Sequence, residues 1–287
     1  MPDIWLPGYL RLEAACAQFI AVVETQGQQH IKPLHQYLTM RLVIEGGFHP
    51  DEITPHPPLV VEARAGRNRL VFDQQAQREN EQTVLGGLKT KDIDVVVAKP
   101  SIGPVVAISV KGTGGAFRNL TNRMEEAIGD CTNLHIMYPG LVYSFLHVLK
   151  ANRAGAQGLA PNDIAVNEKG EVVPAIRRYH DVLLGLAGRR LVRDDLTRYE
   201  AVCLALVNPG PTDAGAIFEP FPPKDSPLSL SAFFDSIYRI YDIRFPYLAA
   251  SVASLKRLEW HESSPALACL GSEPEMRSRL GYAPRLG

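Results

Sequence analysis

Two apolar runs separated by a short turn constrain the fold of this chain more than any other feature. The first run, Ile93–Ala98, is rich in β-branched residues and carries acidic residues at its start. The second run, Val105–Lys111, ends in Ser-Val-Lys, and residues 99–104 between the runs contain two prolines and a glycine. Apolar runs joined by a Pro/Gly turn predict a β-hairpin.

The pleat of the hairpin predicts which side chains share a face. Successive residues of a strand point to opposite sides, so Asp92 and Asp94 lie on one face, and Ser109 and Lys111 also share a face. We therefore expect the hairpin to bring an acid, a hydroxyl and an ammonium group to one place. The apolar residues of the opposite faces are Ile93, Val95, Val97, Ile108 and Val110.

A helix is predicted to follow the hairpin. Gly112–Gly115 is a glycine-rich connection, and the next segment, which begins near Phe117, has apolar residues at helical spacing. On a helical wheel Glu126 points nearly away from this apolar side, whereas Glu125 lies on its flank. We therefore expect Glu125 to be the acid that faces a cleft. The expected buried face is Leu120, Met124, Ala127, Ile128 and Cys131.

This order of residues resembles the PD-(D/E)xK nucleases, in which an acid is followed by a carboxylate-x-Lys pair on the next strand. Ser109 stands where the usual carboxylate would be. In restriction endonucleases that cut CCGG-type cores the motif is Ser-x-Lys, and a glutamate about one helix later supplies the carboxylate. Thirteen residues separate Lys111 from Glu125, which is similar to that spacing. The resemblance covers roughly residues 34–130, and the motif is short.

The resemblance implies magnesium-dependent phosphodiester hydrolysis. Two carboxylates that hold a divalent cation generate the nucleophile and neutralise charge on the phosphate. The plain alternative is a hairpin whose polar ends are merely solvated. Because Lys91-Asp92 replaces the family's Pro-Asp, the choice between Asp92 and Asp94 is open. The implied catalytic residues are Asp94, Ser109, Lys111 and Glu125, and the implied Mg²⁺ ligands are Asp94, Glu125, the Val110 backbone and, as the open alternative, Asp92.

The family often carries a further metal-binding glutamate on the helix that opens its core. Here Ile31–Ile44 is predicted to be that helix, and it ends at Gly46-Gly47-Phe48. The corresponding position is Gln36, beside His35, and the nearest carboxylate is Glu45 at the helix end. The choice of this ligand, Gln36 or Glu45, is open.

DNA contacts are expected from the glycine-rich connection and the helix start. Backbone N–H groups at a helix start can bind phosphate, and arginine and asparagine match guanine and adenine edges. The alternatives are a plain loop, a helix cap and surface arginines. The expected contacts are Gly112, Thr113, Arg118, Asn119, Asn122 and Arg123. The basic turn with Arg64, Arg67 and Arg69 is either a phosphate-contacting loop or a solvated turn.

Elements elsewhere in the chain complete an α/β (α+β) fold, a restriction-endonuclease-like mixed central sheet flanked by helices. We expect one endonuclease domain over residues 1–261, with a core at about 31–150 and a C-terminal α/β extension at about 171–261. Residues 262–287, rich in Pro, Ser, Gly and Arg, are expected to be a loose tail. Further expected helices span 8–24, 177–186, 229–241 and 247–258, and further expected strands span 59–62, 70–72, 141–146 and 199–207.

Composition bears on the ligands and the cellular location that we expect for this protein. The net charge of −1 counts weakly against DNA binding. The four cysteines are far apart and form no CxxC, so no zinc site is expected. The chain start does not resemble a signal peptide, and the longest apolar stretch, Leu141–Leu149, is too short to span a bilayer. We therefore expect a cytoplasmic protein that does not bind membranes.

The predicted function is that of a type II restriction enzyme, a site-specific endonuclease that cleaves double-stranded DNA with Mg²⁺. A homodimer is expected because palindromic DNA matches two-fold symmetry. The alternatives are a non-specific, repair or phage nuclease of the same superfamily, and a non-catalytic DNA-binding module.

Overall fold

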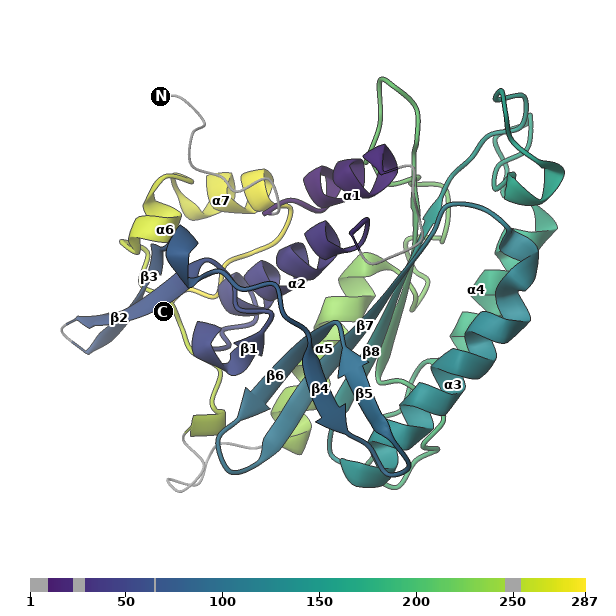
Figure 1. Cartoon of the computed structure of the whole chain (residues 1–287). Helices are drawn as coiled ribbons and strands as arrows, with labels where there is room; N and C mark the ends of the chain where they lie inside the picture. The colour runs from purple at the N-terminus through teal and green to yellow at the C-terminus, as the bar shows by residue number, and fades with distance from the viewer. Residues whose placement is uncertain (1–9, 23–28, 65, 246–253) are drawn as a thin grey trace.

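A mixed β-sheet with helices on both faces forms the centre of the molecule (Figure 1). The computed structural model describes residues 10–22, 29–64, 66–245 and 254–287. Within them the central sheet has five strands in the order β1-β6-β7-β8-β9. The first two pairings are antiparallel, and β7, β8 and β9 run parallel. The strands are β1 (Ile53–Thr54), β6 (Val95–Lys99), β7 (Gly103–Thr113), β8 (Val142–Lys150) and β9 (Ala201–Val207).

The expected hairpin is β6–β7, in which Val95 pairs with Ile108. Its first strand begins two residues later than expected. The chain bends at Asp94, and the residues before it belong to another hairpin, in which β4 (Gln82–Leu85) pairs with β5 (Thr90–Ile93). Asp94 therefore lies at the junction of two hairpins rather than inside a strand.

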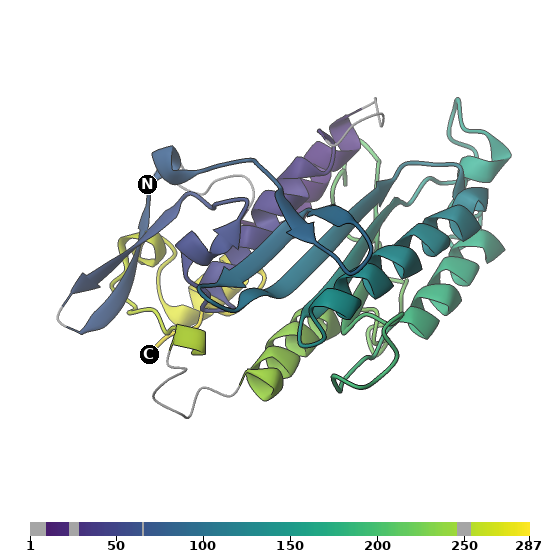
Figure 2. The same ribbon diagram turned by 60° about the horizontal axis from the view of Figure 1, so that its bottom comes forward.

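Alternating side chains of the sheet feed two hydrophobic cores, one on each face. Ile108 and Val110 of β7 pack on the side of the N-terminal helices and α5, whereas Ala107 packs on the side of α3 and α4. Figure 2 shows these layers. Five predicted helices are confirmed, although their ends differ from the predicted ones. They are α1 (Leu12–Ala21), α2 (Lys32–Ile44), α3 (Leu120–Met137), α4 (Pro174–Leu186) and α5 (Leu230–Arg244).

A separate two-stranded sheet projects at one end of the molecule (Figure 1). It consists of β2 (Leu59–Arg64) and β3 (Arg67–Phe72), which confirms both predicted strands. Short 3₁₀ helices lie in the connections: η1 (Pro50–Glu52), η2 (Gln74–Ala76), η3 (Phe117–Asn119) and η4 (Pro161–Asp163).

The C-terminal segment differs from the expected loose tail. Residues 262–287 contain α6 (Pro265–Ala268) and α7 (Glu273–Leu280), and α7 begins with a capping box between Ser272 and Glu275. Just before this segment the indole N–H of Trp260 donates to the Val43 carbonyl at 2.7 Å. Scattered apolar residues anchor the polar sequence, because each reaches the core next to α2. They are Leu267, Leu270, Met276, Leu280 and Tyr282.

The predicted helix over residues 247–258 falls mostly outside the described residues, and residues 254–258 form no α-helix. Within the described ranges, no helix combines the length and apolarity that a membrane span requires.

Candidate metal centre

Asp94 is the acid that the structure brings to the Ser-Val-Lys strand. It is 7% exposed, and its Oδ2 accepts hydrogen bonds from the Val110 backbone N–H at 2.7 Å and the Ser109 hydroxyl at 3.2 Å. Asp92 lies elsewhere: it is exposed and accepts from the Thr83 hydroxyl across the β4–β5 hairpin at 2.5 Å. Of the two acids, Asp94 is therefore the one that contacts the Ser-Val-Lys strand.

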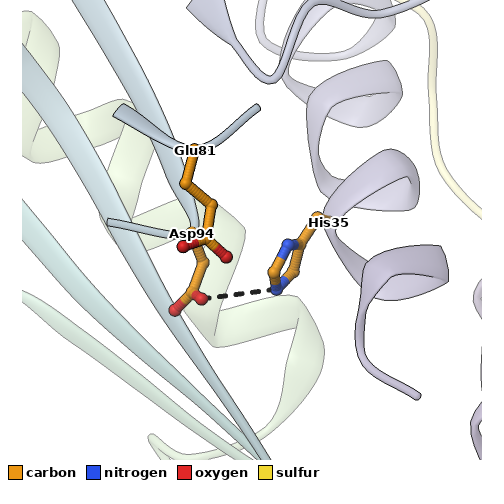
Figure 3. Close-up of side chains that lie close together, drawn as sticks. All are labelled: His35, Glu81 and Asp94. Carbon is orange, nitrogen blue, oxygen red and sulfur yellow. Dashed lines mark ion pairs between the residues drawn. The ribbon is translucent and has the colours of Figure 1, made fainter. Parts of the chain in front are cut away.

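Two further side chains, His35 and Glu81, complete a cluster with Asp94 (Figure 3). His35 comes from the start of α2, and Glu81 directly precedes β4. One potential ligand atom from each of the three residues lies within 4.8 Å of the other two. The His35 Nε2 atom is 3.5 Å from Oδ1 of Asp94. Since ligand atoms on one divalent ion lie no more than about 4 to 5 Å apart, this spacing fits a single cation.

The electrostatics of the cluster also fit a cation. Burial raises the pKa of Asp94, although the Val110 N–H, the charge of Lys111 and the Ser109 hydroxyl oppose this shift. Burial lowers the pKa of His35 to about 4, so the imidazole is neutral at pH 7. The buried Nε2 atom of His35 has no hydrogen-bond partner among the described residues. A neutral imidazole and two carboxylates at a partly dehydrated position are a suitable ligand set for a divalent ion.

Lys111 lies two residues beyond Ser109, on the face of β7 that α3 covers. Its Nζ atom is 3.7 Å from Oε1 of Glu126, and about a third of its side chain is exposed. Together with Ser109, Arg123 and Asp130, this pair lines a narrow crevice. Lys111 is also close enough to the group of His35, Glu81 and Asp94 for its charge to lower the pKa of Asp94 and of His35.

The expectation for the two glutamates of α3 differs from the structure. Glu126, expected to point away, faces Lys111, whereas Glu125 is exposed and makes no hydrogen bond or ion pair among the described residues. The helical wheel identified the buried face, but the crossing of α3 over the sheet decides which flank meets β7. The carboxylate that joins Asp94 comes instead from Glu81, in a polar segment that sequence periodicity does not single out.

The two open positions for a further ligand near α2 differ, because the Oε1 atom of Gln36 is buried without a hydrogen-bond partner among the described residues, whereas Glu45 is paired. The Gln36 amide donates to the Arg78 carbonyl at 3.3 Å. Glu45 pairs with Arg41 at 2.6 Å and accepts from the Tyr238 hydroxyl at 3.0 Å. Glu45 is therefore engaged elsewhere, the choice of Gln36 stays a prediction, and His35 beside it is the residue of α2 in the cluster with Asp94. Its position beside Gln36 on the opening helix was the available sequence signal.

The residues expected to contact DNA are placed very differently from one another. Thr113 is 2% exposed and its hydroxyl lies 3.2 Å from Nε2 of His147, so its side chain is not available to a ligand. A Cβ at Gly112 would lie 2.5 Å from the Phe19 ring, so close packing accounts for this glycine. Asn119 and Asn122 are exposed, and Arg123 is half-buried near Lys111. The side chain of Arg118 lies outside the described residues.

The basic turn forms the tip of the projecting β2–β3 hairpin. Arg64 and Arg67 are exposed, and Arg67 contacts His261. Arg69 donates to the Ser263 carbonyl at 3.0 Å. These contacts attach the hairpin to the C-terminal segment.

Comparison with protein-family models, curated proteins and solved structures found no match for this chain. The geometry of the cluster and the motif around it are therefore the basis for a functional proposal.

Proposed function

We propose that this protein is a divalent-metal-dependent nuclease that hydrolyses phosphodiester bonds of double-stranded DNA. The observation that carries the proposal is the convergence of His35, Glu81 and Asp94 beside Ser109 and Lys111. A metal-ligand set near a partly exposed lysine suits hydrolysis of a charged ester, because both the attacking water and the phosphate carry charge in the transition state.

The proposed metal ligands are the Nε2 atom of His35, Oδ1 of Asp94 and the Glu81 carboxylate, together with the Val110 carbonyl. A bound divalent ion supplies Lewis acidity and an activated water. Carboxylate and carbonyl ligands suit Mg²⁺ and Mn²⁺, and imidazole suits transition metals more than magnesium. We propose Mg²⁺ as the cofactor because the motif implies it, and because of the imidazole ligand we expect Mn²⁺ to support activity at lower concentration.

Lys111 is proposed to orient the attacking water and to stabilise negative charge on the phosphate. Ser109 holds Oδ2 of Asp94, together with the Val110 N–H, so that Oδ1 is directed toward His35. A hydroxyl that only orients a ligand contributes less than a ligand or an ammonium group. We therefore rank Ser109 below Asp94 and Lys111 in its effect on rate.

Sequence specificity is the finer part of the proposal. The start of α3 presents exposed Asn119 and Asn122 near the half-buried Arg123, and these side-chain types match base edges in the major groove. A homodimer would then pair this helix start with both halves of a palindromic site. Discrete fragments from plasmid DNA would support site specificity, and a smear would favour the non-specific nuclease.

The decisive experiment incubates a plasmid of known sequence with the protein in Mg²⁺, Mn²⁺ or Ca²⁺ and compares two matched variants. Asp94→Asn removes the buried acid, and Asp92→Asn removes the exposed acid two residues away. We expect metal-dependent cleavage by the wild type and Asp92→Asn, but not by Asp94→Asn. Intact DNA in every metal, with retardation of DNA in a gel, would leave the non-catalytic DNA-binding module as the function.

A Lys111→Ala variant separates the chemical step from binding. It should lose cleavage rate by roughly 10²- to 10³-fold in single-turnover measurements, while gel retardation in Ca²⁺ changes little, because many basic groups share the contacts to phosphates. Cleavage by Lys111→Ala at the wild-type rate would contradict the proposed role of this lysine.

A further inference from the structure

The β4–β5 hairpin links two members of the metal cluster. Glu81 directly precedes β4, and Asp94 directly follows β5. The two strands pair with each other and form a sheet separate from the central one, and Figure 1 shows them beside the lower half of α3. The orientation of this hairpin therefore sets where the Glu81 carboxylate lies relative to Asp94, which β7 holds independently.

Asn133 of α3 holds the tip of this hairpin. Its Oδ1 atom accepts hydrogen bonds from the backbone N–H groups of Leu88 at 2.8 Å and Lys89 at 3.1 Å. Its Nδ2 atom donates to the Lys89 carbonyl at 2.9 Å. The side chain is 1% exposed. A single buried amide thus satisfies three backbone groups of the turn.

The turn is shaped for this contact. A Cβ on Gly86 would lie 2.1 Å from Nδ2 of Asn133, and a Cβ on Gly87 would lie 2.2 Å from the Ile136 side chain. Both positions therefore require glycine if the hairpin is to lie this close to α3. Further along β5, the Lys91 ammonium pairs with Asp130 of the same helix at 2.6 Å.

We propose that Asn133 is a positioning residue of the metal centre, acting through the β4–β5 hairpin to place the Glu81 carboxylate. This inference rests on the proposed metal site and deepens it. Asn133 contacts the tip of the hairpin, and Glu81 lies at its open end. Without the three hydrogen bonds of the Asn133 side chain, the polar contacts that remain between the hairpin and α3 include the Gly87 N–H bond to the Asn133 carbonyl and the pairing of Lys89 and Lys91 with Asp130. The hairpin can then tilt, which moves Glu81 while the Val110 N–H still holds Asp94.

The expected consequence is weaker metal binding with little change in the chemical step. Residues that orient metal ligands typically change metal affinity by about 10- to 100-fold when they are substituted. Asn133→Ala should therefore raise the Mn²⁺ dissociation constant by about tenfold or more. The cleavage rate at saturating Mn²⁺ should remain close to that of the wild type, because His35, Asp94 and Lys111 are unchanged.

Asn167 offers a matched control. It also clamps a turn, because its Oδ1 atom accepts from the backbone N–H groups of Lys169 and Glu171, each at 2.9 Å. That turn is not adjacent in the chain to His35, Glu81 or Asp94. Asn167→Ala therefore reports the loss of a turn clamp alone and should leave Mn²⁺ affinity unchanged. Asn133→Asp, which retains acceptors for Leu88 and Lys89, should fall between Asn133→Ala and the wild type.

The test measures Mn²⁺ binding by calorimetry without DNA, and cleavage rate against Mn²⁺ concentration. Weaker Mn²⁺ binding by Asn133→Ala with an unchanged Asn167→Ala supports the inference. Equal Mn²⁺ affinity in Asn133→Ala and the wild type, or no Mn²⁺ binding by the wild type, overturns it. If Asn133→Ala does not fold, Asn133→Asp decides by the same criteria.

These experiments can contradict the nuclease function and the positioning role of Asn133 independently of each other. Tight Mn²⁺ binding that depends on Asn133, without cleavage of any DNA, would retain the positioning role and contradict the nuclease function. Metal-dependent cleavage with the same Mn²⁺ dependence in Asn133→Ala and the wild type would retain the nuclease function and reject the positioning role.

Discussion

Two buried carboxylates of this protein, Asp94 and Glu200, each lie beside a buried histidine, yet their surroundings are opposite in charge. Asp94 is 3.5 Å from His35 and close to a second acid, Glu81. Glu200 is 3.3 Å from His135 and lies between two arginines. Burial acts on both acids in the same direction, so their partners must account for the difference.

Both carboxylate oxygens of Glu200 accept hydrogen bonds. Its Oε1 atom accepts from Arg189 and Arg244, each at 2.6 Å, and its Oε2 atom accepts from the Tyr143 backbone N–H at 2.8 Å. Burial alone would raise the pKa of Glu200, but His135 and the two arginines hold it below the ordinary value. The cluster ties the end of α5 and the loop after α4 to the starts of β8 and β9, which is a structural role.

Asp94 receives only two donors at its Oδ2 atom, and its pKa is raised. A second carboxylate and an imidazole without a hydrogen-bond partner lie on its other side. The comparison teaches that burial alone does not identify a functional acid. What distinguishes Asp94 is that burial raises its pKa more than the charges of Lys111 and Lys91 lower it, an imbalance that a bound cation would offset.

The largest expected effect comes from Asp94→Asn. Loss of a metal ligand should lower the cleavage rate by about 10³-fold, equivalent to several kcal/mol. The free energy of unfolding without metal should not fall, because an amide at this place removes a buried charge next to Glu81. Single-turnover cleavage and urea denaturation of the same variant test both parts, and a clear loss of stability would show that Asp94 resembles Glu200.

Glu200→Gln should show the reverse pattern. Removing one partner of a buried ion pair leaves uncompensated charge and costs about 3 kcal/mol or more, here from Arg189 and Arg244. Urea denaturation should reveal the loss, while Mn²⁺ binding by the folded protein stays at the wild-type level. Glu219→Gln, in an exposed pair with Lys224, is the control and should leave stability unchanged within error.

Low pH should lower the free energy of unfolding of the wild type more steeply than that of Glu200→Gln. Because the folded pKa of Glu200 lies below its ordinary value of 4.5, its contribution to stability is present above that value and is lost as the pH falls through the folded pKa. The free energy of unfolding of Glu200→Gln should therefore depend less steeply on pH below about 4.5. Parallel pH profiles for the two proteins would contradict this assignment.

The smallest effects are expected at the two glutamates of α3. Glu126→Gln removes a partner of Lys111, but 55% of the Glu126 side chain and 35% of the Lys111 side chain are exposed, and exposed pairs contribute little. We expect less than about a tenfold change in cleavage rate for Glu126→Gln and none for Glu125→Gln. A loss with Glu125→Gln as large as with Asp94→Asn would restore Glu125 as the displaced carboxylate.

Local sequence patterns predicted the β6–β7 hairpin and most of the long helices. The β-branched runs and the turn between them predicted β6–β7, and apolar spacing predicted the helices and their buried faces, because both signals depend on residues close in the chain. The pattern of Ser109 and Lys111 also placed these side chains on the face toward Asp94 correctly. The C-terminal helices were missed, because their apolar residues are sparse and pack against elements distant in the chain, such as β3.

The sequence by itself determined the mixed sheet, its flanking helices and the association of an acid, Asp92 or Asp94, with the Ser-Val-Lys strand. Only the tertiary structure decided that His35 and Glu81 join Asp94, that Glu126 rather than Glu125 faces Lys111, and that Glu200 is neutralised by arginines. The physical reason is the range of the interactions. Periodicity reports which face of an element is buried, whereas a charge cluster depends on how elements distant in the chain cross one another.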